Sequence, residues 1–197
     1  MFNRLFGKKE PTEPTGDIVV VRLNAKLQPT DRAEHFEEPL DAALREARIG
    51  QVTGGGTMQE ASGEIAYCDI EIALSAAPDK AVPTIVAAFD HLGAPRGSTL
   101  VESSGTEREL GKAEGLAVYL NGTDLPQETY ETCDSNFVYS EFERLLAGEG
   151  RVLSFWEGAT ETAFYMYGGS FPEMRKRLEA FIASYPLCQR CRIVQVA

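Results

Sequence analysis

The amino-acid sequence predicts an α+β protein built from two tandem βαββαβ halves with antiparallel sheets. Strand-like and helix-like patterns alternate from Asp17 to the carboxyl end, and the same order of elements can be read twice. A polar, Glu-rich stretch over 104–114 separates the two readings. The chain has 197 residues, enough for two small domains of roughly 90 residues each. With 43% hydrophobic and 25% charged residues, each half should form a packed core.

The first half, residues 17–103, opens with a Val-rich strand over 18–27, in which apolar side chains alternate onto one face. A helix follows and ends near Gly50, because apolar residues then recur at helical spacing. Pro39 lies inside this pattern. It removes one backbone donor, so we expect it to bend or delay the helix.

The rest of the first half is predicted to hold two strands, a second helix and a final strand. A short strand over 51–59 is interrupted by three glycines, and a clearer one over 64–74 has one apolar and one partly polar face. A helix over 81–92 leads to a strand that passes through Leu100. These elements complete the first βαββαβ reading.

The second half, residues 115–197, repeats this order after the polar connector at 104–114. Its last helix has the clearest start signal, because Ser170 and Glu173 form a Ser-x-x-Glu capping box. The expected elements are a strand over 116–120, a helix from about 134, a hairpin of strands over 151–156 and 162–167, a helix from 170 and a strand over 192–196.

This order of elements resembles that of ferredoxin-like α+β folds. The resemblance rests on element order alone and implies two four-stranded antiparallel sheets, each carrying two helices. Folds of this kind host many unrelated functions, so the resemblance implies no particular activity.

The charge of the chain bears on its partners. Thirty Asp and Glu residues against nineteen Lys and Arg give a net charge of −11, which disfavours nucleic acid and favours a basic protein partner. No apolar stretch approaches the roughly 18 residues of a membrane span, and no secretory signal is evident, so we expect a cytoplasmic protein. Residues 1–16 are predicted to form a flexible basic tip with a Pro/Glu linker, with a docking element as the alternative.

Cysteines and histidines offer little chemistry. Cys188 and Cys191 have CxxC spacing, but a zinc site would need two more ligands, and the other cysteines show no paired spacing. Neither His35 nor His91 belongs to a nucleophile motif. We therefore expect reduced structural thiols, no metal, no cofactor and a protein without catalytic activity.

One candidate ligand site consists of Gly54, Gly55 and Gly56 together with Asp69 and Glu71. Consecutive glycines can aim backbone donors at an anion, but the Lys-Ser/Thr of a nucleotide P-loop is missing. A glycine bulge is the alternative for the glycine run, and a solvated strand face is the alternative for the two carboxylates. A pocket between the halves would bring these five residues together.

The hairpin of the second half concentrates aromatic residues and is the candidate protein-binding surface. Trp156 and Tyr165 are the predicted outward-facing anchors, with Glu157 and Glu161 as the surrounding acidic groups. Packing of these aromatics between the halves is the alternative. The sequence thus suggests a non-catalytic binding domain, immunity-like or regulatory, and the competing interpretation is a small enzyme or ligand-binding protein with a pocket between the halves.

Overall fold

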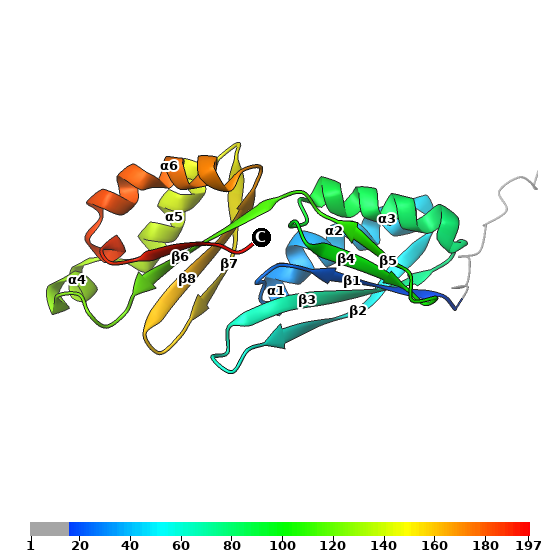
Figure 1. The fold of residues 1–197 in the computed structure, drawn as a ribbon, viewed down its shortest axis with the longest axis horizontal. Coiled ribbons are helices and arrows are strands. Elements are labelled where there is room, and N and C mark those ends of the chain that lie inside the picture. The colour runs from blue at the N-terminus through cyan, green and yellow to red at the C-terminus, as the bar shows by residue number, and fades with distance from the viewer. Residues whose placement is uncertain (1–15) are drawn as a thin grey trace, which may run out of the picture.

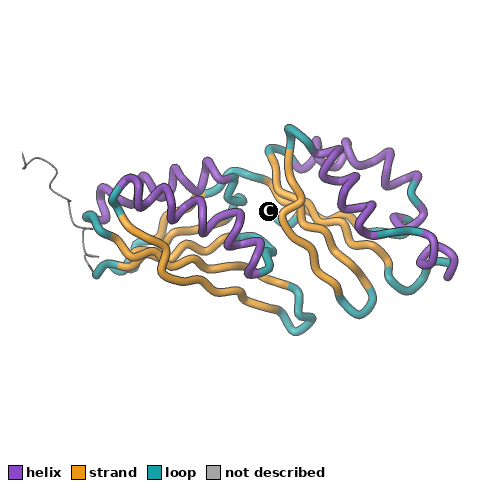
Figure 2. The backbone as a smooth tube through the Cα atoms, turned by 180° about the vertical axis from the view of Figure 1, so that it is seen from behind, coloured by secondary structure: helices purple, strands orange, loops and turns teal. Residues whose placement is uncertain are grey.

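The computed structural model describes residues 16–197, which form two sheets, each covered by helices on one face (Figure 1). Figure 2 shows the same two layers from behind, with the halves arranged along the long axis of the molecule. Residues 1–15, which hold most of the predicted basic tip and linker, lie outside the described residues. Within 16–197, no helix combines the length and apolarity needed to cross a membrane.

The first half contains a five-stranded antiparallel sheet with the strand order β2-β3-β1-β4-β5. Its elements are β1 (Ile18–Leu23), α1 (Pro29–Arg32), η1 (Ala33–Glu37), α2 (Glu38–Ala47), β2 (Gly50–Gln59), β3 (Ile65–Leu74), α3 (Pro78–Leu92), β4 (Ser98–Glu102) and β5 (Glu107–Leu110).

The second half contains a four-stranded antiparallel sheet with the order β7-β8-β6-β9. Without β5, both sheets place their second, third, first and fourth strands side by side, which confirms the predicted fold class of two ferredoxin-like halves. The elements are β6 (Glu114–Asn121), α4 (Gln127–Thr132), α5 (Ser135–Leu146), β7 (Gly150–Glu157), β8 (Glu161–Gly168), α6 (Phe171–Ser184), η2 (Pro186–Cys188) and β9 (Arg192–Gln195).

The stretch over 104–114 is more than a polar connector, because it contains β5, which pairs with β4 at the edge of the first sheet. Three of the four β5 side chains are exposed and only Leu110 is buried. An edge strand that is solvated in this way has almost no apolar alternation, so its sequence does not reveal it. α4 was also not predicted, and none of its side chains is buried.

The first helix continues past Pro39 through a π turn. η1 lies directly before α2, and the backbone N–H of Glu38 bonds to the carbonyl of Ala33 at the wider π spacing. Pro39 then occupies the first turn of α2, where a missing N–H is tolerated. The predicted bend or delay is thus taken up by a local π turn. Ser170 caps α6 as predicted, accepting a hydrogen bond from the N–H of Glu173.

The two halves share part of their core. In the second sheet, Leu116, Val118 and Phe164 pack under the helices of their own half. Side chains on the opposite face, including Tyr165 and Tyr167, join the core of the first half. The second sheet is therefore buried on both faces.

Candidate functional site

A polar cluster joins the halves at the tip of the β2–β3 hairpin. The Glu64 carboxylate accepts hydrogen bonds from the hydroxyls of Tyr119 at 2.6 Å and Tyr165 at 2.8 Å. It also forms an ion pair with the Lys26 ammonium at 3.0 Å. Burial raises the pKa of Glu64, but the three hydrogen bonds outweigh it, so the net pKa lies below its ordinary value. Glu64 is thus a charged acceptor for side chains of the other half.

The tyrosines of this cluster remain neutral donors. Burial, followed by the hydrogen bond to Glu64, raises the pKa of Tyr119 to about 12. The pKa of Tyr165 is raised further by the same two causes. The Tyr167 hydroxyl accepts a hydrogen bond from the backbone N–H of Lys26 at 2.8 Å. These contacts fix the second sheet on the first half.

The predicted protein-binding residues are separated by this arrangement. Tyr165 is 1% exposed, so it is not an outward-facing anchor, and Trp156 is half-buried against the shared core. Glu161 makes two hydrogen bonds of 2.8 Å to Arg192. Among these four residues only Glu157 is exposed. A β-bulge between Val152 and Ser154 shifts the alternation of β7, and strict alternation could not foresee it.

The predicted ligand residues do lie together. In the β2–β3 ladder, Gly54 pairs with Glu71 and Gly56 pairs with Asp69. The Asp69 carboxylate binds the Arg22 guanidinium at 2.9 and 3.1 Å. Neither of the two cavities described below includes these residues.

The glycine run accommodates a partly buried ion pair. Arg32 bonds to Glu37 at 2.6 Å and donates to the carbonyl of Gly56 at 2.9 Å. A Cβ atom on Gly55 would lie 2.5 Å from the Glu37 carboxylate and 2.9 Å from the carbonyl of Asp69. Gly55 therefore leaves space for the ion pair, which gives the glycine run a structural role.

A cavity of about 540 Å³ lies between the halves beside the β7–β8 hairpin. α1 and η1 of the first half form one wall, and α5 with the hairpin forms the other. Among the described residues, no lysine or arginine lines it. We call this cavity the acidic aromatic pocket, and its defining side chains are Asp31, Glu34, Tyr139, Phe155, Glu157 and Phe164.

Two rings of this pocket, Phe155 and Tyr139, are accessible, and the three carboxylates give it a negative potential. Phe155 is 48% exposed and Tyr139 is 37% exposed, although both are large and apolar. Burial raises the pKa of Tyr139, and the charges of Glu143, Asp31 and Glu34 raise it further. A negative potential over exposed rings suits a bound cation. The aromatic content of the sequence pointed to this hairpin, but not to Phe155, Asp31 and Tyr139 as a set, because these residues converge only in the fold.

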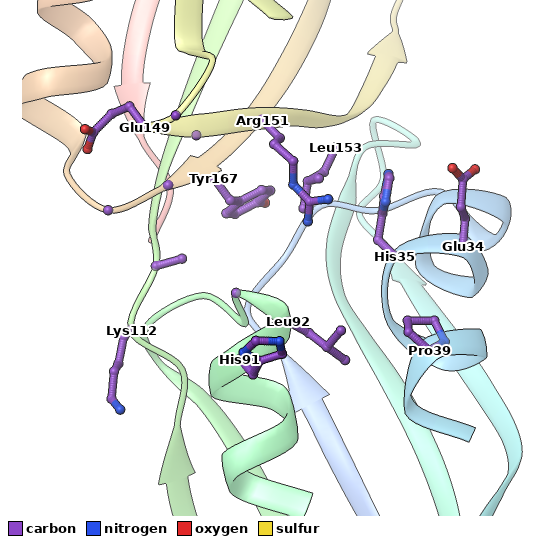
Figure 3. A pocket seen from close by; sticks show the side chains of 16 residues that line it. Glu34, His35, Pro39, His91, Leu92, Lys112, Glu149, Arg151, Leu153 and Tyr167 are labelled. Atoms are coloured by element: carbon purple, nitrogen blue, oxygen red, sulfur yellow. The ribbon is translucent and has the colours of Figure 1, made fainter. Parts of the chain in front are cut away.

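A second cavity of about 1010 Å³, the inter-half cleft, lies on the other side of Leu153. Figure 3 shows Arg151 of β7, His35 of η1 and His91 of α3 on its walls. Among residues 16–197, no cluster of three or more His, Cys, Asp or Glu side chains could hold a metal ion. The lining of the cleft includes Arg151 and Lys112, whereas the acidic aromatic pocket beside it has no lysine or arginine among its described lining residues.

No protein-family model matches the chain, and no curated protein matches it. Among solved structures, a Fusobacterium nucleatum protein described as a "putative monooxygenase" is 12% identical, with 91% of this chain and 90% of that chain covered and a TM-score of 0.32. The first two RRM domains of the yeast poly(U)-binding protein are 12% identical over 91% and 99%, with a TM-score of 0.26. The regulatory subunit of aspartate kinase from Thermus flavus is 13% identical over 84% and 93%, with a TM-score of 0.28. At these values the likenesses carry no inference about function.

Proposed function

We propose that this protein is a non-catalytic, immunity-like or regulatory binding domain that recognises a basic segment of another protein. The observation that carries the proposal is the acidic aromatic pocket, in which three carboxylates surround exposed rings without a lysine or arginine among the described lining residues. Phe155 takes the anchoring role that we predicted for Trp156 and Tyr165, and Glu157 keeps its predicted acidic role.

The chemistry of the pocket favours an arginine or lysine side chain. A cation over an aromatic face gains roughly 0.5–2 kcal/mol, depending on how far it is desolvated. The carboxylates of Asp31 and Glu157 can accept charge-assisted hydrogen bonds from the same cation. Arginine suits the site best, because its planar guanidinium can stack on Phe155 or Tyr139 while it donates at its edge. The net charge of −11 would speed the encounter with such a partner.

A displayed library of random peptides tests this function without a known partner. We expect the full chain to enrich peptides that contain arginine or lysine. Phe155→Ser should weaken the binding of the enriched peptides by about 2 kcal/mol or more, the scale of an interface anchor. Phe137→Ser is the matched control, because Phe137 is 47% exposed but lies against Phe181 and Tyr185, outside the pocket. Enrichment without basic residues, or equal losses in both variants, would contradict the proposal.

The acidic groups are tested separately through the association rate. Glu157→Gln should slow association with an enriched peptide and reduce its salt dependence, because this exposed charge steers the encounter. Glu109→Gln makes the same change in charge at an exposed site on β5 and should leave the rate nearly unchanged. If both variants slow association equally, net charge matters and the pocket does not.

One observation favours the alternative, a small enzyme or ligand-binding protein. The inter-half cleft has a volume in the range of small-molecule sites. Its walls differ from those we predicted, because the glycine run, Asp69 and Glu71 lie elsewhere.

A further inference from the structure

We infer that the inter-half cleft binds the carboxylate or phosphate group of a small organic anion, with Arg151 as the principal binding residue. The inference goes beyond the protein-binding function and does not depend on it, because the acidic aromatic pocket lies on the other side of Leu153.

The unpaired guanidinium of Arg151 is the main observation that supports an anion site. Its exposed side chain comes from the start of β7 and projects toward the cavity (Figure 3). Within the described chain it has no ion pair or side-chain hydrogen bond, whereas Arg144, Arg177 and Arg192 of the same half each face a glutamate. A guanidinium offers a planar fork of donors that matches a carboxylate or phosphate. In a chain of net charge −11, a cation left free in a cleft is available to a ligand.

Two other charged groups of the cleft, Glu149 and Lys112, are paired elsewhere. The Glu149 carboxylate points away from the cavity and lies 3.8 Å from Arg177 (Figure 3). The Lys112 ammonium also points away and pairs with Asp90 at 2.6 Å. Glu34 lines both the cleft and the acidic aromatic pocket, and within the described chain its side chain has no ion pair or hydrogen bond. Arg151 is therefore the lysine or arginine of the cleft lining that has no partner within the described chain.

Two imidazoles extend the set of donors. His35 on η1 and His91 at the end of α3 line the same cavity from the first half. In the part of the chain that the structure describes, neither side chain makes a hydrogen bond or ion pair. An imidazole N–H can donate to an oxyanion that Arg151 holds from the other half.

The size of the cleft indicates that the anionic group belongs to a larger molecule. A volume of about 1010 Å³ far exceeds that of an inorganic ion. Pro39, Leu92 and Leu153 add apolar wall between the polar groups. A ligand with an apolar body and one oxyanion would satisfy both kinds of surface.

Titration of the isotope-labelled full chain, followed by amide resonances, tests the site with two probes, inorganic phosphate and succinate. We expect saturable shifts at the lining amides of Gly93, Gly148 and Gly168 with at least one probe. Binding of phosphate alone identifies a phosphate site, and binding of succinate alone identifies a carboxylate site. Arg151→Gln should weaken binding by about tenfold or more, the scale of a charge-assisted pair.

Arg175→Gln is the matched control, because Arg175 is an exposed arginine of α6 that also has no carboxylate partner within the described chain and lies outside the cleft. Arg175→Gln and Phe155→Ser should each leave the binding of the anion probes unchanged. Arg151→Gln should leave the binding of the enriched peptides unchanged. His35→Gln should cause a smaller loss than Arg151→Gln. Absence of saturable shifts at millimolar concentrations of both probes, or equal affinities of the Arg151 and Arg175 variants, would overturn the inference.

Discussion

The two halves share one topology but bury their sheets differently. The face of the first sheet that lies away from its helices carries Arg22, Asp69 and Glu71, of which Arg22 and Glu71 are exposed. The corresponding face of the second sheet carries Tyr165 and Tyr167 and packs on the first half. The same order of elements can therefore give a sheet that is buried on one face or on both faces. The third strand of each half shows the difference. β3 alternates between buried and more exposed residues from Cys68 to Ile72, whereas β8 contains five consecutive buried residues.

Tyrosine suits the face that joins the halves. Its ring supplies apolar area, while its hydroxyl requires a hydrogen-bonding partner when buried. The partners come from the first half, namely Glu64 for Tyr165 and the backbone of Lys26 for Tyr167. This face is thus specific for one docking geometry, which in turn sets the shapes of both cavities.

The largest loss of stability is expected at the contact between the second sheet and the first half. Tyr165→Ala should cost about 3–5 kcal/mol in the free energy of unfolding, because it leaves a cavity between the halves. Tyr67→Ala changes the same residue type on β3, where the ring stacks with Arg22 on the solvent side, and should cost about 1 kcal/mol or less. Urea denaturation of both variants measures the difference. Equal losses of stability would mean that the first half does not bury this face of the second sheet.

The next effect concerns Glu64. Glu64→Gln should cost about 2 kcal/mol at neutral pH, because a charged acceptor of three hydrogen bonds is lost. The folded pKa lies below the unfolded value of about 4.3, so the contribution is complete above that value and disappears as the pH falls through the folded pKa. The difference in the free energy of unfolding between wild type and Glu64→Gln should disappear only at acid pH. Glu60→Gln, at an exposed position nearby, should show no gap at any pH.

A smaller loss of stability is expected in the second strand of the first half. β2 has three consecutive glycines, and the Arg32–Glu37 pair explains the middle one, Gly55. Gly55→Ala should cost about 1–2 kcal/mol by overpacking. Gly56→Ala, with nothing within 4 Å of its added Cβ, should stay within about 0.5 kcal/mol of wild type. A larger loss of stability for Gly56→Ala than for Gly55→Ala would contradict the structural role of Gly55, and the glycine run would again be a candidate ligand site.

The smallest effect lies on the open face of the first sheet. Asp69→Asn removes a pair with Arg22, whose side chain is 51% exposed, so the loss should be below about 1 kcal/mol. The loss should shrink further at high salt. Thermal unfolding at low and high salt checks both statements. A large, salt-independent loss would show that this face is less open than the structure indicates.

Much of the fold could be predicted because its signals are local. The strand over 64–74 and the capping box at Ser170 depend on neighbouring residues, and both appear in the structure. β5 could not be found, because an exposed edge strand needs no apolar residues. The π turn before Pro39 was also missed, since several backbone solutions satisfy the same missing donor.

The candidate sites depend on distant contacts and were only partly predictable. Glu64 and Tyr165 are 101 residues apart, and nothing in either segment indicates that they meet. The hairpin was identified from its aromatic content, but the bulge at β7 decides that Phe155 is the exposed ring. Arg151 carries no motif. It becomes significant only when the positions of the neighbouring carboxylates are known.

The wall between the two cavities has a thermodynamic consequence. Glu34, His35 and Leu153 line both spaces, so an occupant of either one contacts the same three side chains. If a peptide in one cavity changes the affinity for an anion in the other, the anion must change the affinity for the peptide by the same factor. A cation and an anion on either side of this thin wall attract each other, so the expected sign is positive cooperativity. The protein would then hold its partner most tightly when the small ligand is abundant, which is the behaviour of a sensor.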